Sequence, residues 1–231
     1  YENIKQGIFL ERPIRFIAHI EIDGQVEICH VKNTGRCREL LTHRAPVLVQ
    51  EIDSPKRKTR YDLIAVYKGQ RLINIDSSAP NQVFAEWLHE AGLFHQTALI
   101  KREQQFGSSR FDFYVEGDGR RAFVEVKGVT LEDQGVVRFP DAPTQRGVKH
   151  LKDLVLCVEA GFDAYVVFIV QMNDVLYFEP NWCTHHAFGE ALQEAAALGV
   201  HVMALDCQVK EDSITAGNPV EIRLEKDDPI K

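Results

Sequence analysis

Three side chains of the kinds used in phosphoryl chemistry lie close together in the chain. Asp112 is followed thirteen residues later by Glu125 and then by Lys127, in two segments that alternate or run apolar as short strands do. Because successive side chains of a strand point to opposite faces, we expect Glu125 and Lys127 to share one face while Val124 and Val126 point into the core. Two carboxylates supply hard oxygen ligands for Mg²⁺, and a lysine can steady a water or a developing negative charge. The spacing predicts a Mg²⁺-dependent site for phosphodiester cleavage.

This set of residues resembles the PD-(D/E)xK nuclease core. The resemblance implies that Mg²⁺ or Mn²⁺ binds Asp112, Glu125 and the main-chain carbonyl of Val126, and that Lys127 orients the attacking water. It also implies a further catalytic acid from the preceding helix, where Glu86 stands at a suitable place. Two alternatives stay open, namely a cross-strand ion-pair network for the charged set and a solvent-facing position for Glu86.

Basic side chains in further segments have the chemistry to contact phosphates. Arg36 and Arg38 follow small polar residues that let a backbone approach a phosphate closely, and four basic side chains occupy residues 56–60. A capped helix start and an exposed turn are the alternatives for these two segments. The side chains expected to contact DNA are Arg36, Arg38, Arg57, Lys58, Arg60, Arg110, Arg146, Lys149 and His150.

The last three of these belong to a helix that we expect to begin after Thr144, a residue type that caps helices. Arg146, Lys149 and His150 have the spacing i, i+3 and i+4, so they share one helical face, opposite Leu151. A cationic helix N-terminus with free N–H groups is a ready phosphate site. An ordinary polar helix start is the alternative.

The charge of the chain is unevenly distributed. The 231 residues carry a net charge of −7, yet residues 1–80 carry 13 basic and 10 acidic side chains, whereas residues 81–231 carry 14 and 24. A local basic excess attracts phosphates even on an acidic chain, although a solvated polar face has the same composition. The five cysteines are scattered without a CxxC pair, which argues against a zinc ribbon or disulfide framework and favours the cytoplasm. We expect no signal peptide and no membrane span, since no apolar run approaches 20 residues.

The first eighty residues read as β-rich. Five short strands with little helix predict an N-terminal OB-like β-barrel, a fold that often binds oligonucleotides, although an SH3-like barrel or a meander has the same signature. The expected strands cover residues 14–22, 26–31, 46–52, 61–67 and 71–75. A polar stretch ending in Pro80 marks the expected boundary, which gives domains of residues 1–78 and 79–231.

The second part alternates helical and strand periodicities and predicts an α/β (α+β mixed) domain, a mixed sheet flanked by helices. Helices are expected at residues 81–91, 147–160 and 186–198, and strands at residues 98–106, 110–116, 122–130, 164–171 and 201–209. The acidic tail at residues 221–231 is expected to fray.

Several sequence blocks together resemble the bacterial sugar fermentation stimulation protein A family. The blocks are residues 33–36, 57–59, 107–112, 124–127, 129–131 and 139–151, the last of which reads FPDAPTQRGVKHL. The resemblance covers nearly the whole chain. It implies an OB-like domain joined to a PD-(D/E)xK nuclease-like domain, non-specific and mostly double-stranded DNA binding, and a regulatory role in maltose use.

Three hypotheses of function follow. The leading one is a DNA-binding protein that grips duplex backbone between its two domains, next to a nuclease-like metal site. The second is a working Mg²⁺-dependent deoxyribonuclease that uses Asp112, Glu125 and Lys127. The third is a regulator with a specific operator, which ranks last because the sequence offers no convincing helix-turn-helix.

Overall fold

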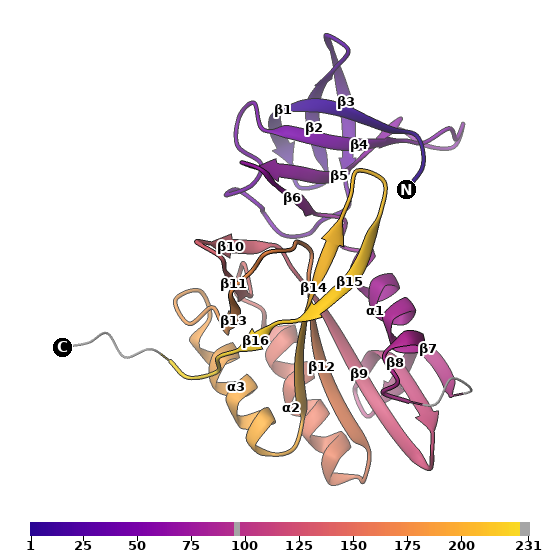
Figure 1. Cartoon of the computed structure of the whole chain (residues 1–231), viewed down its shortest axis with the longest axis vertical. Helices are drawn as coiled ribbons and strands as arrows, with labels where there is room; N and C mark the ends of the chain where they lie inside the picture. Colours follow the sequence, from indigo (N-terminus) through magenta and orange to yellow (C-terminus); the bar gives the residue numbers. More distant parts are fainter. Residues whose placement is uncertain (95–97, 227–231) are drawn as a thin grey trace, which may run out of the picture.

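The computed structural model describes residues 1–94 and 98–226, in two parts stacked along the long axis (Figure 1). The N-terminal part is a closed barrel of five strands, β1 (Ile4–Ile14), β2 (Ile17–Ile22), β3 (Gln25–Val31), β4 (Pro46–Glu51) and β5 (Tyr61–Lys68). The pairing of β3 with β5 closes the order β3-β2-β1-β4-β5, and β6 (Arg71–Asn74) adds to β5 as a hairpin. The predicted OB-like barrel is therefore confirmed.

The strand that opens the barrel was not predicted. Residues 14–22 were expected to be one strand, but β1 ends at Ile14 and β2 begins only at Ile17. Register shifts between Phe9 and Ile14 mark bulges in β1. Each bulge changes which side chains face the core, so β1 lacks the two-residue alternation that identifies a strand in a sequence.

The second part is built on a mixed sheet, as predicted, but the sheet has six strands and the edge strand at residues 214–219 was not expected. Its order is β15-β14-β12-β9-β8-β7, with β9, β12 and β14 parallel and the two edges antiparallel. The strands are β7 (Leu99–Phe106), β8 (Ser109–Gly117), β9 (Arg120–Val129), β12 (Asp163–Val170), β14 (His201–Val209) and β15 (Ile214–Pro219). Helix α1 (Ala79–Glu90) covers one face, and α2 (Gln145–Glu159) and α3 (His186–Ala197) cover the other (Figure 1).

A small second sheet lies beside the barrel and was missed by the sequence prediction. Its order is β10-β11-β13-β16, formed by β10 (Leu131–Asp133), β11 (Val136–Phe139), β13 (Tyr177–Pro180) and β16 (Glu221–Ile222). These strands have two to four residues, too few to display a period. The start of the expected frayed tail is thus paired in β16, and residues 227–231 lie outside the described residues.

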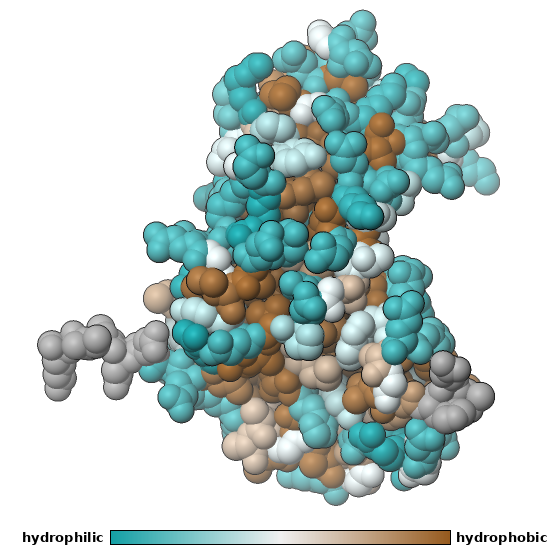
Figure 2. Space-filling view, in the orientation of Figure 1, coloured by the Kyte–Doolittle hydropathy of each residue, from teal (hydrophilic) through white to brown (hydrophobic). Residues whose placement is uncertain are grey.

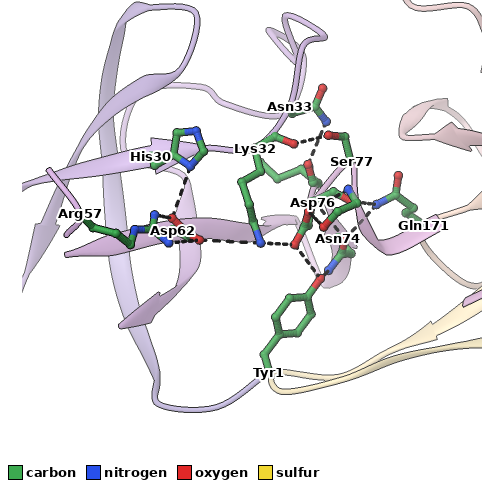
Figure 3. Close-up of polar contacts among 12 residues, drawn as sticks. Tyr1, His30, Lys32, Asn33, Arg57, Asp62, Asn74, Asp76, Ser77 and Gln171 are labelled. Atoms are coloured by element: carbon green, nitrogen blue, oxygen red, sulfur yellow. Dashed lines mark hydrogen bonds and ion pairs between the residues drawn. The ribbon is translucent and has the colours of Figure 1, made fainter. Parts of the chain in front are cut away.

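Buried polar contacts join the barrel to the second part. Gln171 donates to Asn74 at 2.8 Å, and the backbone N–H of Asn74 donates to the Gln171 carbonyl at 3.0 Å. Lys32 bridges two buried barrel acids, with Nζ 2.6 Å from Asp76 and 3.7 Å from Asp62 (Figure 3). One apolar core cluster also contains residues of both parts. The two parts therefore form one packed body.

The surface narrows where the barrel meets the second part, on the side of α1 (Figure 2). The tip of the β14–β15 hairpin reaches the barrel there, where Val209 packs against the cluster that contains Leu48 and Ile64. The helices described in residues 1–94 and 98–226 include none long and apolar enough to cross a bilayer.

Candidate metal and phosphate site

Asp112 lies where β8 changes the face that its side chains present. Phe111 lies beside His150 of α2, with ring centroids 5.9 Å apart, whereas Phe113 packs on Phe84 of α1 at 5.1 Å. Two residues that are two apart on a regular strand would share a face, so the alternation breaks at Asp112. The regular pairing of β8 with β9 also runs no further than Phe113.

The Asp112 carboxylate is held by two hydrogen bonds. Its Oδ2 accepts from the backbone N–H of Val126 at 2.8 Å, and its Oδ1 accepts from the Asn81 side chain at 2.9 Å. Asn81 stands in the first turn of α1, so helix, bent strand and central strand meet at this one acid. Asn81 escaped the sequence analysis, although a polar residue among the apolar positions of a helix is a signal that could have found it.

Glu125 is the buried member of the set, with 4% of its surface exposed. Its Oε1 lies 2.5 Å from Lys127 Nζ and 2.5 Å from His150 Nδ1, while its Oε2 is buried without a hydrogen-bond partner. Val124 and Val126 lie in the core on the α1 side. The alternation expected for β9 is thus observed, and it places Glu125 and Lys127 together.

The two carboxylates have opposite pKa shifts. Burial raises the pKa of Asp112, and the charge of Glu125 raises it further. Burial also raises the pKa of Glu125, but the hydrogen bond from His150 and the charge of Lys127 outweigh it and hold that pKa below its usual value. The site therefore keeps one firmly ionised acid beside a second whose charge is disfavoured, an imbalance that a cation would relieve.

The donor set fits a divalent cation in part. Among the residues that the structure describes, no three His, Cys, Asp or Glu side chains gather as a metal cluster. Asp112 and Glu125 nevertheless offer carboxylate oxygens, and the Glu125 Oε2, which has no hydrogen-bond partner, can accept a hydrogen-bond donor or a cation. A hard ion such as Mg²⁺, Mn²⁺ or Ca²⁺ accepts such ligands and completes its shell with waters and main-chain carbonyls. The Val126 carbonyl stays a predicted ligand.

Glu86 is placed away from this set. It lies on the exposed side of α1, and its carboxylate accepts from Gln82 at 2.7 Å. Asn81, not Glu86, is the α1 residue that contacts Asp112. The helical stripe of apolar residues predicted the orientation of α1, but it could not tell which polar neighbour of the stripe reaches the sheet. The expectation that Glu86 joins the acids is corrected on this ground.

The start of α2 is only partly the phosphate site that was expected. Thr144 caps the helix by accepting from the N–H of Gly147 at 3.0 Å, as predicted, and Arg146 is exposed. His150 is instead buried between Arg146 Nε, 3.3 Å away, and Glu125. A buried ring cannot contact DNA, so His150 is a positioning residue for Glu125.

Lys149 is half-exposed, but acceptors already surround its ammonium group. Its Nζ lies 2.6 Å from Ser109 Oγ and 2.7 Å from Asp153 Oδ2. Arg110, at the start of β8, is exposed and pairs with Glu103 at 2.7 Å. Both cations stay candidates for phosphate contact, with part of their charge already balanced.

The basic loop before β5 is also partly neutralised. Arg57 forms an ion pair with the buried Asp62, and Arg60 forms one with Glu51. Only Lys58 of the three predicted contacts in this loop is exposed without an ion pair among the described residues. Because acidic partners compete with phosphate, Arg57 and Arg60 are weaker candidates than their sequence suggested.

A basic groove on the barrel contains cations that the sequence analysis missed. It has a volume of about 860 Å³, and its lining includes Arg12, Arg15, Arg36, Arg38 and His43. Arg36 and Arg38 are exposed, and neither forms an ion pair within the described chain. The signal that could have found the others is a pair of arginines flanking a proline at residues 12–15.

Arg12 organises this groove. Its guanidinium donates to the carbonyls of Arg15, Asn33, Gly35 and Arg36, so it ties the β1–β2 turn to the loop that carries Arg36. The same loop is tightened by the N–H of Gly35, which donates to the Asn33 side chain at 2.7 Å. The loop that carries Arg36 is therefore held in place by these hydrogen bonds.

A smaller cavity of about 190 Å³ lies next to the groove, at the joint between the two parts. Thr34 and Gly35 line both the groove and this cavity. The cavity is also lined by Pro80 and Gly128, the sequence neighbours of Asn81 and Lys127. The groove and the cavity therefore share the loop of Thr34 and Gly35, and the cavity is lined by sequence neighbours of two residues of the carboxylate site and not by the two acids.

Comparison with known proteins gives matches over nearly the whole chain. Residues 10–75 match the family model described as SfsA N-terminal OB domain, and residues 78–213 match the one described as sugar fermentation stimulation protein RE domain. A sugar fermentation stimulation protein homolog of Desulfitobacterium hafniense (strain Y51) is 62% identical over 97% of this chain and 98% of its own length. The homolog of Clostridium beijerinckii is 54% identical over 97% of this chain and 99% of its own. The solved structure of Pyrococcus furiosus SfsA in complex with Ca²⁺ superposes with a TM-score of 0.88 at 27% identity and covers 96% of this chain and 97% of that one.

Proposed function

Because the chain belongs to the sugar fermentation stimulation protein family, we propose that it binds DNA by the backbone and holds a divalent cation at Asp112 and Glu125. Binding through phosphates carries little sequence preference and weakens steeply as salt rises. The cytoplasm, which the scattered cysteines favour, is the compartment we expect for this activity.

One observation carries the cation half of the proposal. Glu125 Oε2 is buried without a partner, next to an Asp112 whose pKa burial and the Glu125 charge both raise. A divalent cation between the two carboxylates would satisfy the first and neutralise the second. The structure of the Pyrococcus furiosus relative is described as a complex with Ca²⁺, which supports a divalent ion here.

The DNA half of the proposal is supported by the barrel groove. Arg36 and Arg38 line it and form no ion pair among the described residues, and it shares Thr34 and Gly35 with the smaller cavity at the joint between the two parts. Without a cation the acids would repel a phosphate, whereas with one they would attract it. The cation and the DNA should therefore bind cooperatively.

Hydrolysis is the second candidate function, and the position of Lys127 favours it. An ammonium group 2.5 Å from a buried carboxylate can orient a water or stabilise a developing negative charge. In such a step water attacks phosphorus in line, one P–O ester bond breaks, and the leaving oxygen takes up a proton. A divalent cation would contribute charge neutralisation and an activated water.

A regulatory role in maltose use stays a proposal that the family resemblance implies. Sequence-specific regulation needs side chains that read base edges, usually from a helix in the major groove. The three helices described in residues 1–94 and 98–226 each pack a face onto the sheet. Footprinting on a maltose promoter at physiological salt would favour this role only if one sequence were protected.

A paired assay tests the two functions together. Labelled DNA is incubated with the protein in EDTA, Mg²⁺ or Mn²⁺, and both retention and cleavage are scored for wild type, Glu125→Gln and Arg36→Ala/Arg38→Ala. We expect the arginine variant to lose retention in all buffers and Glu125→Gln to lose only the metal-dependent gain. Cleavage that Glu125→Gln abolishes would establish hydrolysis, and wild-type protein that retains no DNA in any buffer would refute the proposal.

A further inference from the structure

The first residues of β8 are paired with a neighbouring strand on one side only. The regular pairing of β8 with β9 covers Phe113 to Gly117, whereas the pairing with the edge strand β7 extends to Ser109. The segment 109–111, which leads to Asp112, is therefore attached to the sheet through β7 alone. Because a two-stranded ribbon has little stability of its own, this segment needs a further anchor.

Helix α2 supplies the anchor through three side chains, Ser109, Lys149 and Asp153, which we call the Ser109 cluster. Ser109 is 3% exposed, and its hydroxyl donates to Asp153 Oδ2 and accepts from Lys149 Nζ at 2.6 Å. Lys149 Nζ also lies 2.7 Å from Asp153 Oδ2, one turn further along α2. A hydroxyl of the strand is thus held between an ammonium and a carboxylate of the helix.

The hydrogen bonds of this cluster favour the ionised form of Asp153. Burial raises the pKa of Asp153, but the hydrogen bonds from Lys149 and Ser109 outweigh it and hold that pKa below its ordinary value. Hydrogen bonds to an ionised group are about twice as strong as those between neutral groups. Ser109 is buried and cannot reach a substrate, so the cluster acts on the arrangement of strand and helix.

The same turn of α2 contacts the second acid of the cation site. His150 follows Lys149 in the chain, and its Nδ1 lies 2.5 Å from Glu125 Oε1. The Ser109 cluster therefore joins the β8 segment that leads to Asp112 with the helical turn that contacts Glu125. A displacement of this turn relative to β8 would change the separation of the two carboxylates.

We propose that Ser109 and Asp153 are positioning residues of the cation site, which fix the separation of the Asp112 and Glu125 carboxylates through Lys149 and α2. The inference rests on the proposed cation site and adds two residues outside its ligand set. A divalent cation shared by two carboxylates needs an oxygen of each at about 2.0–2.6 Å. A small shift of one carboxylate therefore weakens binding.

Isothermal titration calorimetry with Mn²⁺, without DNA, tests the inference on wild type, Ser109→Ala, Asp153→Ala and Asp153→Asn. We expect Ser109→Ala and Asp153→Ala each to lose about tenfold or more in Mn²⁺ affinity, the effect typical of residues that orient metal ligands. Asp153→Asn removes the charge but keeps an oxygen that accepts from Ser109 and Lys149, so it should keep most of the affinity. Alanine suits a helix, so Asp153→Ala retains the test if Ser109→Ala does not fold.

Glu132→Ala is the control for a general loss of stability. It removes a buried carboxylate that pairs with Lys68 and Arg71 at the joint between the two parts. Urea unfolding should show it to be less stable than the wild type, while its Mn²⁺ affinity stays the same.

Each other outcome overturns the inference. Unchanged Mn²⁺ affinity in Ser109→Ala and Asp153→Ala would reduce the cluster to a structural contact, and an equal loss in Asp153→Asn and Asp153→Ala would assign the effect to charge. An equal loss in Glu132→Ala would assign it to stability. Wild-type protein that binds Mn²⁺ no better than these variants defeats this inference alone, whereas wild-type protein that binds no Mn²⁺ defeats the proposed cation site as well.

Discussion

The backbone N–H of Val126 donates a hydrogen bond to the Asp112 carboxylate, with 2.8 Å between N and Oδ2. The bond forms where the regular β8–β9 pairing has ended, so a side chain occupies the place of a main-chain acceptor. It anchors Asp112 to Val126, the residue that follows Glu125 in β9. The bend in β8 is thus the device that brings two carboxylates together at the edge of the central strands.

Replacing Asp112 by Asn should stabilise the protein at neutral pH. Burial and the Glu125 charge raise the pKa of Asp112, so its ionised form is disfavoured in the folded state. The penalty is present above the folded pKa and disappears as pH falls below the ordinary value of 3.8. Urea unfolding should show Asp112→Asn more stable by about 1 kcal/mol at pH 7, with the gap closing in acid. A loss of stability at pH 7 would contradict the claim that the ionised Asp112 carboxylate is disfavoured in the folded protein.

Replacing His150 by Phe should lower the stability of the protein at neutral pH. Burial raises the pKa of Glu125, but the bond from His150 and the Lys127 charge outweigh it, so the ionised carboxylate adds stability above its ordinary pKa of 4.5. That stability is lost as pH falls through the lower folded pKa. We expect His150→Phe to cost about 2–3 kcal/mol at pH 7 and less below pH 4.5.

His150→Gln serves as the matched control, because its amide can still donate to Glu125. It should recover part of the lost stability and bind DNA like the wild type. If His150→Gln alone weakened DNA binding, the ring would contact DNA after all, and the positioning role would be wrong.

Glu132 should matter for the joint between the two parts. This buried carboxylate on β10 accepts from Lys68 at 2.7 Å, from Arg71 at 2.8 Å and from the N–H of Gly135 at 2.6 Å. Removal of one partner from a buried ionic group is costly, and the partial exposure of both cations moderates the loss. We expect Glu132→Ala to lose about 2 kcal/mol in urea unfolding, against almost no loss for the exposed Glu90→Ala. Equal stability of the two variants would show that the contacts of Glu132 with Lys68, Arg71 and Gly135 add no stability.

Gly128 should tolerate no side chain. A Cβ there would lie 2.6 Å from Gln171 Oε1 and 2.8 Å from Pro80 Cγ, both at the joint beside the carboxylate site. Gln171 is buried and bonded to Asn74, so it cannot move aside freely. We expect Gly128→Ala to cost about 1–3 kcal/mol in thermal or urea unfolding. Gly119→Ala, in an open turn with positive φ, isolates the effect of backbone conformation from that of crowding.

The sequence predicted those parts of the fold that repeat a regular period. The apolar stripe of Val83, Phe84 and Leu88 identified α1 and its buried side, and the apolar run 164–171 identified the central strand β12. Strand β1 was not predicted because its bulges interrupt the alternation of side chains. The short strands of the second sheet depend on tertiary pairing that a local pattern does not contain.

In the candidate site, too, the sequence predicted the contacts that follow from a regular strand and missed those that depend on tertiary packing. Alternation along β9 predicted that Glu125 and Lys127 share a face, since β9 is regular there. The helical spacing of Arg146, Lys149 and His150 was read as one polar face, yet the sheet covers part of it and buries His150. His150 is buried where it contacts the Glu125 carboxylate of β9, and the spacing along the helix does not reveal that contact. Asn81 was missed for the same reason.

The most direct test of the cation site is a Mn²⁺ titration followed by electron paramagnetic resonance, without DNA. Wild type, Glu125→Gln and Glu86→Gln are compared, the last removing an exposed carboxylate that contacts Gln82. We expect a tight Mn²⁺ site in the wild type and in Glu86→Gln, with a loss of about tenfold or more in affinity for Glu125→Gln. Equal Mn²⁺ binding by all three proteins would contradict the assignment of the cation to Asp112 and Glu125.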